Sequence, residues 1–366
     1  MPAKIALVGE AYGENEERLR LPFVGASGVE LLTMMNEASL IKLTQADYSS
    51  IEDFWRKGRD PLNIALVWAS HPEFFCTNTF NLRPNSKNDV LALCGLKKET
   101  GSTLPPLKQG KYLWPKYETE LARLKKELEE VKPNLIIALG NTPSWALFGQ
   151  TSITKIRGTV FHSTLCPGLK VLPTFHPAAV LREYKYRAVT VVDLAKAKRE
   201  SAFPEVRRPH REIFIPETLE DIEVFASRYL DRAEYIAVDI ETAAQQITCI
   251  GFAGQIDRAL VIPFLDPRKP GQSYWPDLST EICAWNYVKD ICALPAKKVF
   301  QNGLYDLHFL YRGYGIRPSN CEHDSMLLHH ALQPESPKGL GFLGSVYTDE
   351  PAWKLMRDRK TNKRDE

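Results

Sequence analysis

In the first half of the chain, a glutamate, an asparagine and a histidine each lie within or directly after a predicted strand. Glu10 follows the apolar run at residues 4–9, Asn78 lies in the run at 74–82, and His176 follows the run at 171–174. The carboxyl ends of parallel strands meet at one edge of an open α/β sheet, so these side chains are expected to lie close together. An amide, a histidine and a carboxylate, with an aromatic such as Phe23, suit recognition of a flat polar base.

A nucleotide site is the ordinary alternative, because a strand, a glycine-rich loop and a helix also form a phosphate cradle. The loop GEAYGE at residues 9–14 matches neither GxGxxG nor the lysine-containing P-loop. Its glutamates would also repel phosphate, and this disfavours the nucleotide site.

A second group of acidic residues lies in the other half of the chain. Asp239 and Glu241 are two residues apart on a predicted strand and therefore point to one face. Asn302 and Asp306 have i, i+4 spacing at a predicted helix start, which also predicts one shared face. Three convergent carboxylates bind Mg²⁺ or Mn²⁺, and two such metals can activate water against a phosphodiester. We therefore expect Asp239, Glu241 and Asp306 to be metal ligands.

The pattern of elements predicts two α/β domains. Strand and helix signals alternate over residues 1–200, which is typical of a parallel sheet covered by helices, apart from an insertion near 40–70. Residues 201–211 contain two prolines and three arginines and are predicted to be a linker. The pattern restarts over 212–354, and residues 355–366 form a charged tail. Helices are expected at 118–131, 181–200, 217–230, 280–292, 304–312 and 324–332, and strands of the second half at 235–240, 248–254 and 259–263.

Composition is that of a globular protein of two domains. The 366 residues are 44% hydrophobic and 25% charged, with a net charge of +2. Seven cysteines without CxxC spacing indicate reduced thiols in a cytosolic compartment. The N-terminus lacks a signal-peptide core and no run approaches the ~20 apolar residues of a membrane span. We expect a soluble, cytoplasmic protein with no membrane partner.

The motifs of the first half resemble a known family. The order GEAxGxxE, PFVGxxG, TNxxxxRP, ALGN and PTxHPAxxLR is similar to the uracil-DNA glycosylase superfamily, most of all to its family-four branch, over residues 4–195. The resemblance implies that Phe23 stacks on a flipped uracil and that Asn78 reads its edge. It implies that His176 bonds the uracil oxygen that gains charge, and that Glu10 and Glu16 lie near the sugar and the base.

Two departures from this family are visible. Tyr12 replaces the usual proline and is expected to narrow the pocket. Family-four members carry an iron–sulfur cluster with a cysteine pair ahead of the first strand, and only three residues precede the strand here. Cys76 and Cys94 alone cannot hold a cluster, which normally needs four thiolates, so none is expected.

The second half resembles the 3′→5′ proofreading exonuclease domain of family A DNA polymerases, of the phage type, over residues 213–354. DIET and NGLYD resemble its first two motifs, and the resemblance implies a ribonuclease H-like fold in which Asp324 is structural and Asn302 contacts substrate. The third motif, Tyr-x-x-x-Asp, is not found, because Tyr347 and Asp349 are only two residues apart. We therefore expect an incomplete exonuclease domain, with a fragment or a polymerase chain that completes it as the alternatives.

Together the two resemblances predict a protein that recognises and excises uracil from DNA, coupled to an exonuclease-like domain, in the cytoplasm of a bacterial host if phage-encoded. The alternative is a module that binds single-stranded or uracil-containing DNA without turnover. Under both hypotheses the expected phosphate contacts are basic side chains: Arg83, Arg182, Lys185, Arg187, Arg207 and Arg208.

Overall fold

The computed structural model of the chain describes residues 3–266, 268–269 and 271–350. Contacts divide the described chain into two compact units, the first formed by residues 3–208 and 344–350 and the second by residues 209–343. The expected tail at 355–366, and the end of the expected exonuclease domain at 351–354, lie outside the described residues. Within the described residues, no helix is long and apolar enough to cross a membrane.

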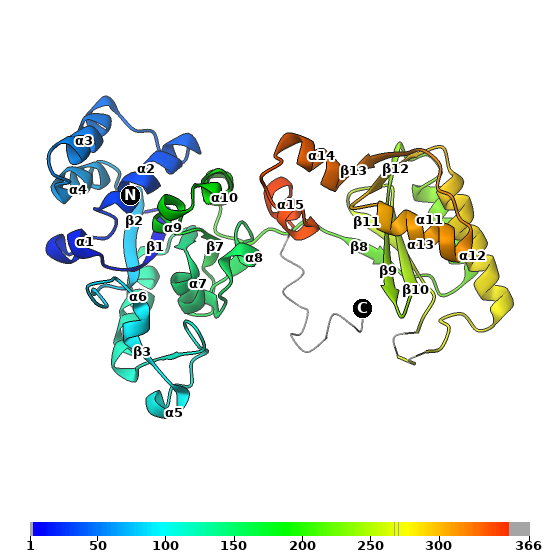
Figure 1. Cartoon of the computed structure of the whole chain (residues 1–366), viewed down its shortest axis with the longest axis horizontal. Coiled ribbons are helices and arrows are strands. Elements are labelled where there is room, and N and C mark those ends of the chain that lie inside the picture. The colour runs from blue at the N-terminus through cyan, green and yellow to red at the C-terminus, as the bar shows by residue number, and fades with distance from the viewer. Residues whose placement is uncertain (1–2, 267, 270, 351–366) are drawn as a thin grey trace. The chain divides into compact units, whose positions relative to one another are not determined.

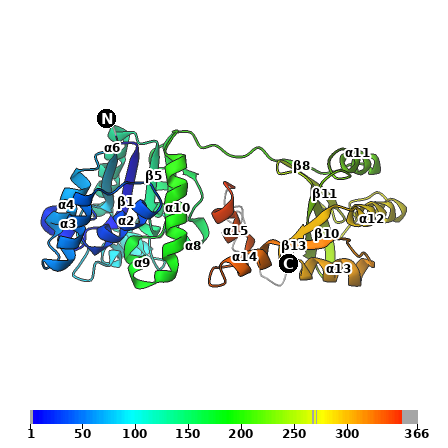
Figure 2. The same ribbon diagram turned by 90° about the horizontal axis from the view of Figure 1, so that it is seen from above.

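A five-stranded sheet with helices packed around it forms the first unit (Figures 1 and 2). The strand order is β2-β1-β5-β7-β6, and all pairs are parallel except β6 with β7. Central strand β5 is buried along its whole length, as its sequence LIIAL requires for a strand covered on both faces. The strands are β1 (Ile5–Ala11), β2 (Phe74–Phe80), β5 (Leu135–Leu139), β6 (Phe161–His162) and β7 (Lys170–Thr174), with a separate small pair β3 (Cys94–Gly95) and β4 (Tyr112–Leu113).

The helix expected at 118–131 is present as α6, and α1, α5 and α8 are short helices that the sequence did not predict. Two further regions of the first unit differ from the prediction. The insertion at 40–70 forms a helical hairpin, α3 and α4. The helix expected at 181–200 is interrupted, because the backbone is extended at Glu183 and Tyr186 stacks on Phe175 with ring centroids 4.2 Å apart. The helices are α1 (Glu14–Leu19), α2 (Ala26–Glu37), α3 (Gln45–Arg56), α4 (Pro61–Ala69), α5 (Lys97–Thr100), α6 (Glu118–Val131), α7 (Asn141–Phe148), α8 (Ile153–Ile156), α9 (Pro177–Arg182) and α10 (Arg187–Glu200).

The first half of the predicted linker packs on the first unit. The buried ammonium of Lys170 on β7 donates to the carbonyls of Glu200, Phe203 and Glu205 at 2.8, 2.8 and 3.0 Å. It also pairs with the Glu200 carboxylate at 2.9 Å. A buried charge needs such partners, so residues 200–205 are fixed by Lys170 rather than forming a free connection.

The second unit is a mixed six-stranded sheet with helices (Figure 1). Its order is β13-β12-β9-β10-β11-β8, in which β10 is antiparallel to both neighbours and the other pairs are parallel. The strands are β8 (Glu212–Phe214), β9 (Tyr235–Ala243), β10 (Gln246–Ala253), β11 (Arg258–Pro263), β12 (Lys297–Phe300) and β13 (Cys321–Asp324), and the helices are α11 (Leu219–Tyr229), α12 (Leu278–Ala293), α13 (Leu304–Tyr314) and α14 (Ser325–Leu332). Helix α15 (Leu340–Tyr347) begins in the second unit, and its residues from 344 onward belong to the first.

Alternation along β9 decides which side chains of this strand reach solvent. Ile236, Val238 and Ile240 are buried in the core, whereas Asp239 and Glu241 are exposed on the opposite face. This is the arrangement that the two-residue period predicts. The predicted α/β class is confirmed, with a sheet in the first unit that is parallel except for β6.

Candidate active site

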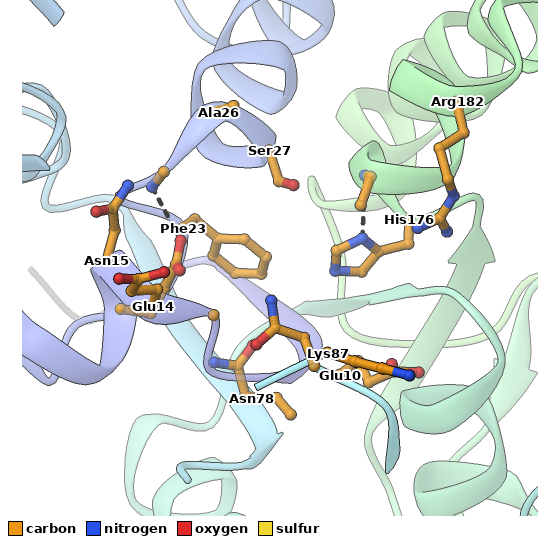
Figure 3. A pocket seen from close by; sticks show the side chains of 16 residues that line it. Glu10, Glu14, Asn15, Phe23, Ala26, Ser27, Asn78, Lys87, His176 and Arg182 are labelled. Carbon is orange, nitrogen blue, oxygen red and sulfur yellow. Dashed lines mark hydrogen bonds between the residues drawn. The ribbon is translucent and has the colours of Figure 1, made fainter. Parts of the chain in front are cut away.

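The structure brings the four predicted residues of the first unit to one pocket at the carboxyl ends of the parallel strands. Glu10 at the end of β1, Asn78 near the end of β2, His176 after β7 and Phe23 from the loop before α2 line a cavity of about 380 Å³ (Figure 3). The register pairs Gly9 with Asn78 across β1 and β2. Strand topology therefore produces the cluster from residues that are far apart in sequence.

Asn78 and Phe23 lie together over Gly9. A Cβ on Gly9 would come within 2.2 Å of the Asn78 Oδ1 and 2.8 Å of the Phe23 ring, so both side chains occupy space that only glycine leaves open. Asn78 is 2% exposed, and its Nδ2 has no hydrogen-bond partner among the described residues. A buried donor without a partner is costly, and a polar ligand would satisfy it.

His176 faces Phe23 from the other side of the pocket (Figure 3). Its Nδ1 accepts a hydrogen bond from the Ala178 main-chain N–H at 3.1 Å. Burial lowers the pKa of His176 to about 4, and the positive charge of Arg182 acts in the same direction. The imidazole is therefore neutral near pH 7, and because Nδ1 is an acceptor, the ring proton resides on Nε2 as a donor.

Glu10 is held at the start of α7. The Thr142 hydroxyl donates to its carboxylate at 2.5 Å, and α7 begins at Asn141 directly after β5. Glu10 also lines a second cavity of about 470 Å³, which shares His176 and Arg182 with the first. The Glu10 carboxylate thus lies at the boundary between the two cavities.

Glu16 organises the loop that carries Phe23. Its carboxylate accepts a hydrogen bond from the Gly25 N–H at 2.9 Å, and it also lines the pocket. Tyr12 is not among the lining residues; it is buried, and its hydroxyl donates to the Arg20 carbonyl at 3.2 Å. The expectation that Tyr12 narrows the pocket is therefore wrong, because its ring packs away from this space.

The expected phosphate contacts divide into two groups. Arg182 lines the pocket and is exposed, as is Lys87, which the sequence analysis did not identify. Arg83 does not line the pocket; it pairs with Glu17 at 3.4 Å and bonds the Asn88 amide oxygen at 2.9 Å. Three of the four other expected groups are also paired with acids: Arg187 with Glu30 and Glu37, Lys185 with Glu183, and Arg207 with Glu205. Arg208 is exposed.

Sequence reasoning missed the groups that fix the pocket residues in place. Arg123 on α6 donates to the carbonyls of Asn78 and Thr79 at 2.7 and 3.2 Å, and so fixes the end of β2. Thr142 orients Glu10, and the Trp68 indole N–H donates to the Phe23 carbonyl at 2.9 Å. None of these belongs to a motif: Thr142 directly follows ALGN, whereas Arg123 lies on α6 and Trp68 lies in the predicted insertion.

The thiols of the first unit do not fit an iron–sulfur cluster. Cys94 and Cys166 donate to the carbonyls of Val90 and Lys125, and burial raises the pKa of Cys76, Cys94 and Cys166. Cluster ligands must be thiolates, which these surroundings disfavour. The expectation of a protein without a cluster stays a prediction, and no step below involves one.

In the second unit, Asp306 on α13 lies against β9. It is 3% exposed, and its carboxylate accepts the Ile240 N–H at 3.0 Å. Burial raises the pKa of Asp306 to about 6; the hydrogen bond from Ile240 opposes this, and the negative charge of Asp239 adds to it. A cation beside Asp239 and Asp306 would stabilise the ionised form.

Other predicted residues of this unit are placed differently. Asn302 was expected on one helical face with Asp306, but α13 begins only at Leu304 and Asn302 adopts a left-handed turn with φ of 63°. That prediction is wrong, because the carboxylate of Asp324 accepts the N–H groups of Asn302 and Gly303 and holds the turn. Among the described residues, no three carboxylate, histidine or cysteine side chains are close enough to hold one metal ion.

The geometry agrees with the comparison with protein families. The family described as the uracil DNA glycosylase superfamily matches residues 2–199, which is more than half of the chain. This chain belongs to that superfamily. A second family, described as 3′-5′ exonuclease, matches residues 213–363. Both resemblances seen in the sequence are confirmed.

The glycosylase superfamily part has curated relatives of moderate identity. The Type-4 uracil-DNA glycosylase of Saccharolobus solfataricus is 28% identical over 206 residues, covering 54% of this chain and 70% of that protein. The enzyme of the same name from Thermotoga maritima is 26% identical, with 54% and 78% covered.

The relatives of the exonuclease part share a smaller portion of their length with this chain. A DNA polymerase of Bacillus phage SP01 is 31% identical over 127 residues, covering 32% of this chain but only 13% of that polymerase. Among solved structures, Escherichia coli RNase D matches with a TM-score of 0.29 and 18% identity, covering 42% of this chain and 39% of that chain. Brucella melitensis NrnC with bound Mg²⁺ matches with a TM-score of 0.23 and 14% identity, covering 37% of this chain and 59% of that chain.

Proposed function

We propose that this chain removes uracil from DNA. The observation that carries the proposal is the buried Asn78 amide, whose Nδ2 has no partner among the described residues. It lies beside the Phe23 ring over Gly9, and opposite His176. An amide offers a donor and an acceptor side by side, which matches the O4 and N3–H edge of uracil. Membership of the glycosylase superfamily supports the same substrate.

The proposed reaction breaks the bond between C1′ of the sugar and N1 of the base. The base must first leave the helix, since its glycosidic bond cannot be reached inside a duplex. Phe23 stacks on it, and the electron pair of the broken bond goes to the uracil, whose developing negative oxygen accepts the Nε2–H of His176. The Glu10 carboxylate stabilises the positive sugar. The oxygen of a water molecule then bonds C1′, and the proton that this water loses neutralises the uracil anion.

A direct assay tests the proposal. The substrate is a 5′-labelled single strand with one uracil, incubated in EDTA so that any metal-dependent nuclease is silent, and then cleaved with alkali. A single cut at the uracil is expected, and an identical strand with thymine should stay intact. An uncut uracil strand that the protein still binds would instead favour the alternative of a DNA-binding module without turnover.

Replacing Asn78 with aspartate should change the choice of base. An ionised aspartate accepts hydrogen bonds but cannot donate one to the uracil O4, whereas it can accept from the amino group of cytosine. We expect the ratio of uracil to cytosine release for Asn78→Asp to fall by about 10- to 100-fold. The measurement is base release from matched strands, and Asn81→Asp is a nearby control. A ratio equal to that of the wild type would remove Asn78 from base recognition.

We propose a 3′→5′ exonuclease as the second activity. Asp239 and Asp306 lie within electrostatic reach of one another, and Glu241 follows on the same face of β9. We infer that Asp239 and Asp306 hold Mg²⁺ or Mn²⁺ when it binds, with Glu241 as a further carboxylate on the same face of β9, and the metal would supply a Lewis acid for phosphodiester hydrolysis. This proposal ranks second because the described residues contain no ready-made cluster of three ligands. A polymerase chain that completes this unit is proposed as its partner.

Asp306→Asn should lower any metal-dependent nuclease activity to the level of the EDTA control. The amide keeps an acceptor for the Ile240 N–H and nearly the same volume, but loses the negative charge that a metal needs. The measurement is shortening of a 5′-labelled strand with Mg²⁺ or Mn²⁺. Asp290→Asn, at an exposed position on α12, is the matched control. Digestion by Asp306→Asn at the wild-type rate would assign the nuclease elsewhere.

A further inference from the structure

The backbone of Phe23 adopts a conformation that its surroundings must enforce. Its φ is 57°, in the left-handed region, which is unfavourable for a residue with a Cβ. Gly28 leaves the necessary space, because a Cβ there would lie 1.7 Å from the Phe23 carbonyl oxygen. The position of the aromatic ring in the pocket therefore depends on where this carbonyl is held.

Trp68 holds that carbonyl from outside the motif loops. Its indole Nε1–H donates to the Phe23 oxygen at 2.9 Å across 45 residues of sequence. The two rings also lie near each other, with centroids 6.4 Å apart and planes tilted by 50°. Trp68 thus contacts both the backbone and the ring of Phe23, although it is not among the residues that line the pocket.

The hairpin of α3 and α4 provides a rigid support for Trp68 (Figure 1). Ser70, two residues after Trp68, donates to the buried carboxylate of Asp47 at 3.0 Å. The same carboxylate accepts the Thr44 N–H and hydroxyl, both at 2.7 Å, in a capping box that starts α3. One buried acid therefore ties the end of α4 to the start of α3, which fixes the position of Trp68.

We propose that the α3–α4 hairpin fixes the position of the Phe23 ring in the base-binding pocket, and that Trp68 is the positioning residue through which it does so. This inference rests on the proposed uracil excision. It assigns a role to the segment that appears in the sequence only as an insertion. Loss of the Trp68 hydrogen bond should weaken recognition of the extruded base and leave binding of the DNA backbone unchanged.

Trp68→Phe tests this role, because it removes the N–H donor and keeps an aromatic ring, although a smaller one. The usual contribution of one neutral hydrogen bond corresponds to a loss of about 2- to 12-fold of uracil release in single-turnover assays. Binding to a strand with a stable abasic analogue, which has no base, should stay within about twofold of the wild type. Trp55→Phe, at a half-exposed position on α3, is the matched control and should behave as the wild type.

A double-mutant cycle separates positioning from general loss of stability. In a Phe23→Ala background the ring that Trp68 positions is absent, so adding Trp68→Phe should cause little further loss of uracil release. The inference would be overturned if the losses of the two variants are additive, or if Trp68→Phe releases uracil at the wild-type rate. It would also be overturned if Trp68→Phe loses abasic-strand binding to the same extent as uracil release. If the wild type releases no uracil, the proposed function fails. The inference is then judged by whether Trp68→Phe removes any preference for binding uracil strands over abasic strands.

Discussion

His176→Ala is expected to lower uracil release by about 100- to 1,000-fold. The neutral imidazole presents Nε2–H to the pocket, and loss of one such preorganised donor to a developing oxyanion has an effect of this size. Single-turnover release from the uracil strand in EDTA measures it, with binding of an abasic strand as the test of correct folding. Release within about threefold of the wild type would exclude His176 from the mechanism.

The pH dependence of this effect follows from the same geometry. The pKa of His176 is lowered to about 4, so the ring stays neutral as the pH falls from about 7.5 to about 5.5 and becomes protonated only near pH 4. The ratio of wild-type to His176→Ala rates should therefore be constant over that range. A ratio that changes around pH 6.5 would show a histidine with an ordinary pKa.

Gly9→Ala should have the second large effect, with a loss of about 100-fold in uracil release. The added Cβ would lie 2.2 Å from Asn78 Oδ1 and 2.8 Å from the Phe23 ring, so both groups that contact the base must move. A displacement of about 1 Å in a catalytic pocket can cost this much. Gly9 lies within β1 and does not have a positive φ, so alanine causes no backbone strain there.

Two controls make the Gly9 result specific. Gly313→Ala adds the same methyl group within α13, where nothing lies within 4 Å of it, and should leave uracil release unchanged. Abasic-strand binding by Gly9→Ala should also persist, because the change is confined to the base pocket. Wild-type uracil release by Gly9→Ala would contradict the placement of Asn78 and Phe23 over this glycine.

The sequence by itself determined the order of elements, the two families and the residues at the strand ends. The boundaries of α6, β9 and α14 lie within a residue or a few of their predicted positions, because capping signals and hydrophobic periods are local. The alternation that exposes Asp239 and Glu241 is local for the same reason. Glu10, Asn78 and His176 could be grouped in advance because parallel strands end at one edge of a sheet.

Only the tertiary structure decided how those residues are held. The bond from Trp68 to Phe23, that from Thr142 to Glu10 and the contact of Arg123 with β2 join segments 45 to 132 residues apart, and no spacing rule reveals them. The turn at Asn302 replaced a helical start because the distant Asp324 carboxylate binds its N–H. Local signals in the sequence determine where the strands and helices that carry the motifs begin and end. The direction and protonation of each side chain depend instead on neighbours that are distant in sequence.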